Sequence, residues 1–258
     1  MLHRVARAAV RPETYPGQLR EAVSLAVTAA MWPFGMADNG EREIAGIGRR
    51  PAPLRPTPVL LVHGFAANKS NWAFLRRDLR AAGYGHVHAL NYNPFTADIP
   101  TIAAQCVERA RSLMEATGAD GVHVVGHSLG GVVARYAVQI GGLEEALTCA
   151  TVASPHQGVG SARVAAWPLS VCQLRPDHDV LVRLRASSRR MRTRFVAYYS
   201  NLDLLVSGER GRIVEAPLRA SNVLIKDEGH LSILLSRRLS GSLLGELAAA
   251  EAPAVAAA

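Results

Sequence analysis

One short stretch of the sequence places a serine where it could act as a nucleophile. The residues GHSLG at 126–130 follow an apolar run and precede a helical pattern. The spacing G-x-S-x-G between a strand and a helix is typical of a sharp turn that exposes the serine hydroxyl. Gly126 and Gly130 leave space where a side chain would collide with backbone, and the helix dipole favours negative charge at this end. We therefore predict that Ser128 is a nucleophile, with a chance match to a short pattern as the alternative.

A serine hydroxyl needs a general base, and His230 is the best candidate among the nine histidines. It follows the last predicted strand, where the chain order Ser, Asp or Glu, His that accompanies this turn places the base. His127 adjoins the serine, but we expect it to point away from the reacting face. His63 and His156 precede the expected acid, so we interpret them as structural or substrate-loop residues.

The base in turn needs an acid that fixes its tautomer and stabilises the imidazolium formed during attack. Asp203 lies four residues after the predicted strand 195–199 and is our candidate. Asp227 and Glu228 are rivals. They lie three and two residues before His230 on one loop, where presenting a carboxylate to that ring is awkward.

Attack by a serine on a carbonyl creates an oxyanion, which two backbone N–H groups usually stabilise. One should come from Leu129, the residue after the nucleophile. The other should come from the His-Gly-Phe-Ala loop at 63–66, where we favour Phe65. Both donors belong to the main chain, so changing the side chains would test them poorly.

Short apolar runs alternate with amphipathic stretches along the chain, which predicts a mostly parallel sheet with helices on both faces. Ligands of such sheets bind beyond the carboxyl ends of the strands, where all the residues above fall. The predicted strands are 58–62, 86–90, 122–125, 146–152, 195–199 and 222–225, and the predicted helices include 99–117 and 132–140.

Composition excludes several other functions. The chain has 258 residues and a formal charge of +8, but the basic residues are scattered arginines without interleaved aromatic residues, so we expect no nucleic-acid binding. The three cysteines have no paired spacing, and no His, Asp or Glu cluster has ligand spacing. We therefore expect no disulfide framework, no metal and no cofactor.

The first 57 residues differ from the rest and predict an N-terminal helical segment and linker ahead of a catalytic domain at 58–258. The apolar run 22–36 is shorter than the ~20 residues of a membrane span and contains Pro33. We expect a helix over about 16–32 that packs on the domain or over its active-site mouth. A signal peptide and peripheral membrane contact are the alternatives, so we expect a cytoplasmic or peripherally membrane-associated protein with export left open.

Seven stretches of the sequence, among them those around Ser128, Asp203 and His230, together resemble the bacterial lipase/esterase branch of the α/β-hydrolases. They are most similar to actinobacterial lipase-like proteins. GHSLGG occurs in many hydrolases, but HGF before it and SPHQG after it make the ordered set more specific. The matching stretches are PVLLVHGFAANKSNW, LNYNPFTADIPT, VHVVGHSLGGVVARY, VASPHQG, QLRPDHDVL, YYSNLDLLV and DEGHLS.

The resemblance implies an α/β-hydrolase fold, a catalytic triad of Ser128, His230 and Asp203, and an oxyanion hole at Phe65 and Leu129. It also implies a cap or lid at about 160–192. The expected function is hydrolysis of carboxylic esters, with acyl lipids as substrates in the manner of a triacylglycerol lipase. Acyltransferase, thioesterase and small-ester carboxylesterase activities use the same triad and stay open, as does a binding protein on a retired hydrolase scaffold.

Overall fold

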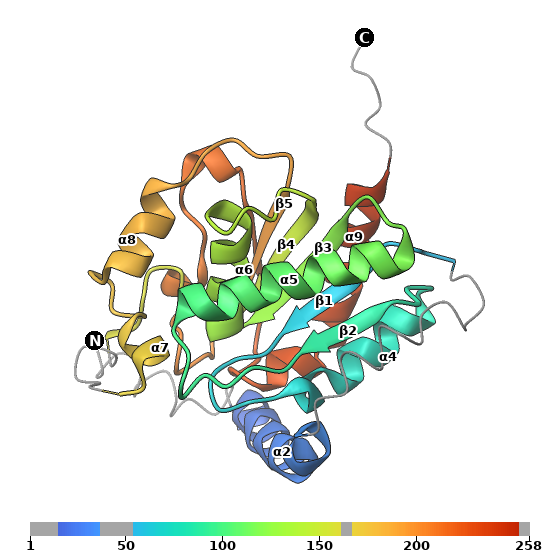
Figure 1. Cartoon of the computed structure of the whole chain (residues 1–258). Coiled ribbons are helices and arrows are strands. Elements are labelled where there is room, and N and C mark those ends of the chain that lie inside the picture. Colours follow the sequence, from blue (N-terminus) through green and yellow to red (C-terminus); the bar gives the residue numbers. More distant parts are fainter. Residues whose placement is uncertain (1–14, 37–53, 161–166, 253–258) are drawn as a thin grey trace.

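A six-stranded sheet lies at the centre of the molecule (Figure 1). The computed structural model describes residues 15–36, 54–160 and 167–252. The strands lie in the order β2-β1-β3-β4-β5-β6, and every neighbouring pair is parallel, which confirms the predicted sheet. The strands are β1 (Val59–Val62), β2 (Val87–Leu90), β3 (Val122–His127), β4 (Ala146–Val152), β5 (Arg194–Tyr199) and β6 (Ser221–Leu224).

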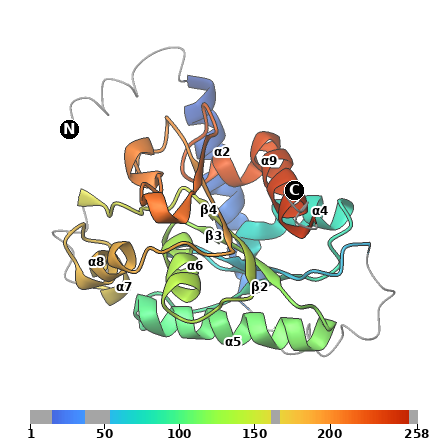
Figure 2. The same cartoon turned by 90° about the horizontal axis from the view of Figure 1, so that it is seen from above.

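Helices cover both faces of the sheet because its central strands are apolar on both sides. Along β1, Leu60 and Val62 face one core, whereas Val59 and Leu61 face the other. Figure 2 shows helices on each side of the sheet. The first core contains α5 (Ile99–Thr117) and α6 (Leu129–Gln139), and the second contains α4 (Ala73–Ala81) and α9 (Arg237–Glu251).

The carboxyl ends of parallel strands meet at one edge, and this edge carries the residues selected from the sequence. Ser128 directly follows β3, Asp203 follows β5, and His230 follows β6. Short helices lie in several of the connections between the strands. They are η4 (Lys69–Trp72), α7 (Leu169–Cys172), α8 (Asp179–Ala186), η6 (Gly208–Gly211), η7 (Ala216–Leu218) and η8 (Ser232–Leu235).

The segment predicted to form a cap is partly described. Residues 161–166 lie outside the described residues, and the remainder contains α7 and α8. Leu181 and Leu184 of α8 are buried in the first core beside α6. Trp167 stacks on Phe95 with ring centroids 5.6 Å apart. The role of this segment as a lid stays a prediction.

The N-terminal helix α2 (Tyr15–Met31) lies across the outside of the sheet edge and continues into η2 (Trp32–Gly35) (Figure 1). Its position is close to the range expected from the sequence. Most of the predicted linker, at 37–53, lies outside the described residues. In the described part of the chain, α2 and the other helices are all too short or too polar to span a membrane.

Candidate active site

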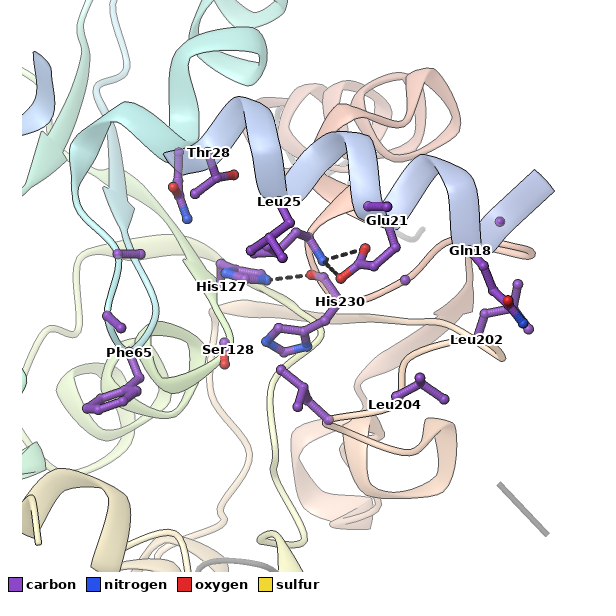
Figure 3. A pocket seen from close by; sticks show the side chains of 18 residues that line it. Gln18, Glu21, Leu25, Thr28, Phe65, His127, Ser128, Leu202, Leu204 and His230 are labelled. Carbon is purple, nitrogen blue, oxygen red and sulfur yellow. Dashed lines mark hydrogen bonds between the residues drawn. The ribbon is translucent and has the colours of Figure 1, made fainter. Parts of the chain in front are cut away.

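The backbone at Ser128 adopts a conformation that L-residues rarely take. Ser128 stands between β3 and α6 with φ 54° and ψ −123°. Such a conformation costs on the order of 1–3 kcal/mol and persists only where the surroundings hold it. The Ser128 N–H donates to the carbonyl oxygen of Val152 at 2.9 Å, which ties the turn to the neighbouring strand. The turn directs the hydroxyl into a pocket at the sheet edge (Figure 3).

Two glycines allow this turn because no side chain could fit in their place. A Cβ at Gly126 would come within 2.3 Å of the Gly130 carbonyl oxygen. A Cβ at Gly130 would come within 2.1 Å of the carbonyl oxygen of Val62 and 2.3 Å of that of His63. These neighbours are backbone atoms, which cannot move aside as a flexible side chain can. The spacing of the two glycines is therefore a steric requirement of the turn.

We expect Gly130→Ala to destabilise the protein by about 1–3 kcal/mol, the usual cost of forcing an extra methyl group into a packed site. Any reaction that uses the Ser128 hydroxyl should slow as well, because the turn must shift. Gly245→Ala is the matched control. Gly245 lies in α9 with open space around its Cβ position, so alanine there should leave stability unchanged or raise it. Urea unfolding measures both, and equal stabilities of the two variants would contradict the steric argument.

The structure brings Asp203 and His230 together. The Nδ1–H of His230 donates to Oδ2 of Asp203 at 2.8 Å, and both side chains are buried. The other carboxylate oxygen of Asp203 accepts from the backbone N–H groups of Leu205 at 2.9 Å and Val206 at 2.8 Å. The carboxylate is thus fixed on both oxygens. The opposite edge of the His230 ring faces Ser128 across the pocket (Figure 3).

The rival carboxylates have other partners. Oδ1 of Asp227 accepts from the side-chain amide of Asn201 at 3.2 Å. Glu228 forms ion pairs with Arg20 at 3.3 Å and Arg238 at 3.7 Å. This geometry favours Asp203 as the partner of His230.

Two further histidines near the turn are buried in the neutral form. Loss of solvation lowers the pKa of His63 to about 4 and that of His127 to about 3. The His63 ring stacks on Tyr92 at 4.1 Å between centroids, and its Nδ1–H donates to the Gly64 carbonyl oxygen at 2.8 Å. The Nε2–H of His127 donates to the carbonyl oxygen of His230 at 2.9 Å. The His127 side chain therefore supports the backbone of the candidate base.

These lowered values predict that acid weakens the fold. In the unfolded chain both histidines take up protons below about pH 6.5, whereas in the folded protein they stay neutral to lower pH. Each should therefore remove about 1.4 kcal/mol of stability per pH unit, from about pH 6.5 down to its own folded pKa. We expect His63→Gln to reduce the slope of unfolding free energy against pH by one such contribution. Urea unfolding at a series of pH values measures it, and an unchanged slope would contradict the prediction.

A cavity of about 800 Å³ opens beside Ser128 and His230. Phe65 lines it, as do Leu202, Leu204 and Leu205 from the loop that carries Asp203. Phe65 also contacts Phe95 with ring centroids 4.9 Å apart. Leu129, the other predicted donor of the oxyanion hole, is a buried residue at the start of α6. The roles of the Phe65 and Leu129 N–H groups stay predictions.

The sequence predicts a helix over about 16–32 that packs on the domain or over its active-site mouth, but it does not predict which residues of α2 line this cavity. One side of the helix faces the pocket along several turns (Figure 3). The helix residues that line the cavity are Gly17, Gln18, Glu21, Ala22, Leu25 and Thr28. Within 15–36, 54–160 and 167–252, His, Cys, Asp and Glu side chains form no group of three that could hold a metal ion.

Comparison with known proteins shows similarity to lipases over the part of the chain that contains Ser128. Residues 56–162 match the family model described as Lipase (class 2). A triacylglycerol lipase of Pseudarthrobacter phenanthrenivorans is 29% identical over 109 residues, which are 39% of this chain and 34% of that protein. A triacylglycerol lipase of Burkholderia plantarii is also 29% identical over 109 residues, 39% of this chain and 30% of that protein. The chain thus matches about a third of the length of these relatives.

Solved structures show the same fold over more of the chain. The mature form of the Bacillus licheniformis lipase BlEst2 superposes with a TM-score of 0.63 at 17% identity, covering 77% of this chain and 93% of that one. The 2-hydroxy-6-oxo-6-phenylhexa-2,4-dienoate hydrolase of a Rhodococcus strain gives 0.55 at 18% identity, covering 74% and 91%. The α/β-hydrolase fold and the resemblance to bacterial lipases and esterases are therefore confirmed. The family match includes Ser128 but ends before Asp203 and His230.

Proposed function

We propose that this chain, an α/β-hydrolase in fold and a relative of bacterial lipases, cleaves carboxylic esters with Ser128, His230 and Asp203 as its catalytic triad. The observation that carries the proposal is the His230 ring. Its Nδ1–H is bound to the carboxylate of Asp203 at 2.8 Å, while its other edge faces Ser128 in the pocket. A base held by an acid beside a half-buried serine, which stands in a strained turn and lines the pocket, is the arrangement that nucleophilic acyl transfer requires.

In the proposed reaction, Ser128 Oγ attacks the ester carbonyl carbon while Nε2 of His230 takes the hydroxyl proton. The tetrahedral intermediate collapses, the bond to the alcohol oxygen breaks, and the alcohol leaves with the proton from His230. Water then attacks the acyl-enzyme and gives a proton to His230. The acid leaves, and Ser128 Oγ recovers its proton from His230.

The negative oxygen of both intermediates would be bound by the N–H groups of Leu129 and Phe65. Leu129 starts α6, so its N–H group lies at a helix terminus, where the dipole favours an anion. Removing one such donor typically costs ~10²–10³ in rate. This is the size of contribution that we expect from each.

The substrates are acyl esters, and the pocket favours lipids among them. Its walls are mostly apolar, with Leu25 and Ala22 on α2 and Phe65 and Leu204 among the residues opposite. A cavity of about 800 Å³ gives room for an extended acyl chain. Apolar walls would desolvate such a chain and stabilise its binding.

The test is hydrolysis of p-nitrophenyl esters from acetate to palmitate, together with labelling by a serine-reactive phosphonate and identification of the labelled peptide. Hydrolysis of long-chain esters with the label on Ser128 supports a lipase, and hydrolysis of short esters alone supports an esterase. Product analysis with added alcohols separates hydrolysis from acyl transfer, and a thioester series tests thioesterase activity. No hydrolysis and no label at Ser128 would overturn the proposal in favour of a binding protein.

A further inference from the structure

We propose that helix α2 belongs to the catalytic apparatus, with Glu21 as a positioning residue that holds the backbone at His230. The inference rests on the proposed function, since it assigns Glu21 a role in placing the general base. The carboxylate of Glu21 accepts from the N–H of Leu231 at 2.9 Å and from the N–H of Ser232 at 2.8 Å. Hydrogen bonds to an ionised acceptor are about twice as strong as neutral ones.

The contact clamps one peptide unit from two sides. The carbonyl oxygen of His230 and the N–H of Leu231 belong to the same planar group. The Nε2–H of His127 donates to that carbonyl oxygen at 2.9 Å, and Glu21 accepts from that N–H (Figure 3). A peptide plane held at both ends fixes the backbone dihedral next to it, and therefore the direction in which the imidazole of His230 leaves the chain.

Helix and loop approach each other too closely for ordinary side chains. A Cβ at Gly229 would lie 2.3 Å from Oε2 of Glu21. A Cβ at Gly17 would lie 2.4 Å from the Leu202 side chain and 2.9 Å from the carbonyl oxygen of Asp227. Glycine thus stands on both sides of the interface at positions where a Cβ would collide with the opposite segment.

Neighbouring side chains on α2 bind opposite kinds of groups on the loop. Glu21 binds backbone donors, whereas Arg20 binds acceptors. The Arg20 guanidinium donates to the carbonyl oxygen of Asp227 and, at 3.3 Å, to the carboxylate of Glu228. Exchanging the two residues would set donors against donors and acceptors against acceptors, so these contacts favour the observed position of the helix.

The other end of the same segment is bonded to the opposite side of the pocket. The side-chain amide of Asn68 donates to the Trp32 carbonyl oxygen at 2.8 Å, and that of Asn91 donates to the Gly35 carbonyl oxygen at 2.7 Å. Asn68 lies three residues after Phe65, in the loop that follows β1. Residues 15–36 therefore bridge the loop of the candidate base and the loop of a candidate oxyanion donor, across strands β3, β4 and β5.

The experiment compares Glu21→Ala and Glu21→Gln with wild type in the full-length chain. We expect Glu21→Ala to lower kcat by ~10²-fold with little change in KM, because a shift of about 1 Å in a catalytic group has an effect of this size. Glu21→Gln is isosteric and keeps one acceptor oxygen, so it should retain the fold and lose less, about tenfold. The rate at which a phosphonate labels Ser128 should fall in parallel, since His230 must take the Ser128 proton as the phosphorus–oxygen bond forms and the leaving group departs.

Glu251→Gln is the matched control. Glu251 is also partly buried and ties a helix to the rest of the domain, through Arg55 at 2.6 Å and His123 at 3.2 Å, but it does not line the pocket. We expect this variant to lower the melting temperature and leave kcat and the labelling rate unchanged.

If Glu21 contributes only to folding, its variants will have a lower melting temperature and a smaller fraction of chains that the phosphonate can label. Their kcat, calculated per active site titrated by the phosphonate, will equal that of wild type. This result would overturn the proposal. The proposal would also be overturned if the Glu21 variants react with the phosphonate and hydrolyse esters at the same rates as an active wild-type protein. The proposed triad would be unaffected by that result. A wild-type protein that neither labels nor hydrolyses esters would instead overturn the function on which the inference rests.

Discussion

Replacing Ser128 with alanine is expected to lower kcat for ester hydrolysis by ~10⁶, the scale seen when the nucleophile of such a triad is removed. The alanine has no oxygen to form the proposed acyl-enzyme, while the pocket and the proposed oxyanion donors remain. Stability should rise or stay the same, because the change removes one atom from an open pocket. The measurement is steady-state hydrolysis of a p-nitrophenyl ester, with circular dichroism to establish that the fold is retained.

Ser154→Ala is the control for this experiment. Ser154 is a second serine close to the turn, but its hydroxyl donates to the Val152 carbonyl oxygen at 3.1 Å and is buried. Its loss should leave kcat near the wild-type value. A Ser128→Ala variant with substantial turnover would mean that another residue or a bound water performs the attack.

Replacing Asp203 with asparagine is expected to lower kcat by ~10⁴ with the fold retained. The asparagine oxygen can still accept from the N–H groups of Leu205 and Val206, which leaves the amide nitrogen pointing at His230. A donor there requires Nδ1 of His230 to accept, so the proton moves to Nε2, the atom that must take the Ser128 proton. The wrong tautomer removes the base without removing the ring. Single-turnover acylation of the variant measures the loss.

Asp227→Asn provides the comparison, because Asp227 is the rival acid in the same region. Its φ of 64° is one that asparagine tolerates, and its carboxylate contacts only the exposed Asn201 amide among the hydrogen bonds of the described residues. We expect wild-type kcat. Loss of activity in Asp227→Asn together with normal activity in Asp203→Asn would assign the acid to Asp227.

Most of the sheet could be predicted because each of its strands is signalled locally. The apolar runs before Ser128 and at 58–62 are buried on both faces, and period and length suffice to find such strands. Helix α9 was missed, although Leu239, Leu243 and Leu247 recur at helical spacing on its buried face. That signal was present in the sequence and would have found the helix.

Some residues of the candidate site can likewise be identified from the sequence, whereas others cannot. Ser128 has a local motif, and His230 follows from chain order, so both could be selected without a structure. Glu21 could not, because its partners lie 210 and 211 residues away and no local pattern marks it. Gly17 and Gly229 could not be identified from the sequence either. Gly17 is required because α2 lies close to Leu202 and Asp227, and Gly229 because its loop lies close to Glu21 of α2. Contacts of this range come from packing, which single-sequence patterns do not encode.

The separation in sequence between Glu21 and the His230 loop also determines when the two can come into contact during synthesis. During synthesis α2 is made early, and the residues that it binds follow 210 positions later. At ~5–20 residues per second, the helix waits for on the order of ten seconds or more before its docking site exists. Until then the carboxylate of Glu21 lacks the N–H groups that it binds in the folded protein, and incompletely packed nascent chains are prone to aggregate or to engage chaperones. The Glu21 contact that we propose for placing His230 can accordingly form only after the chain has been synthesised through Ser232.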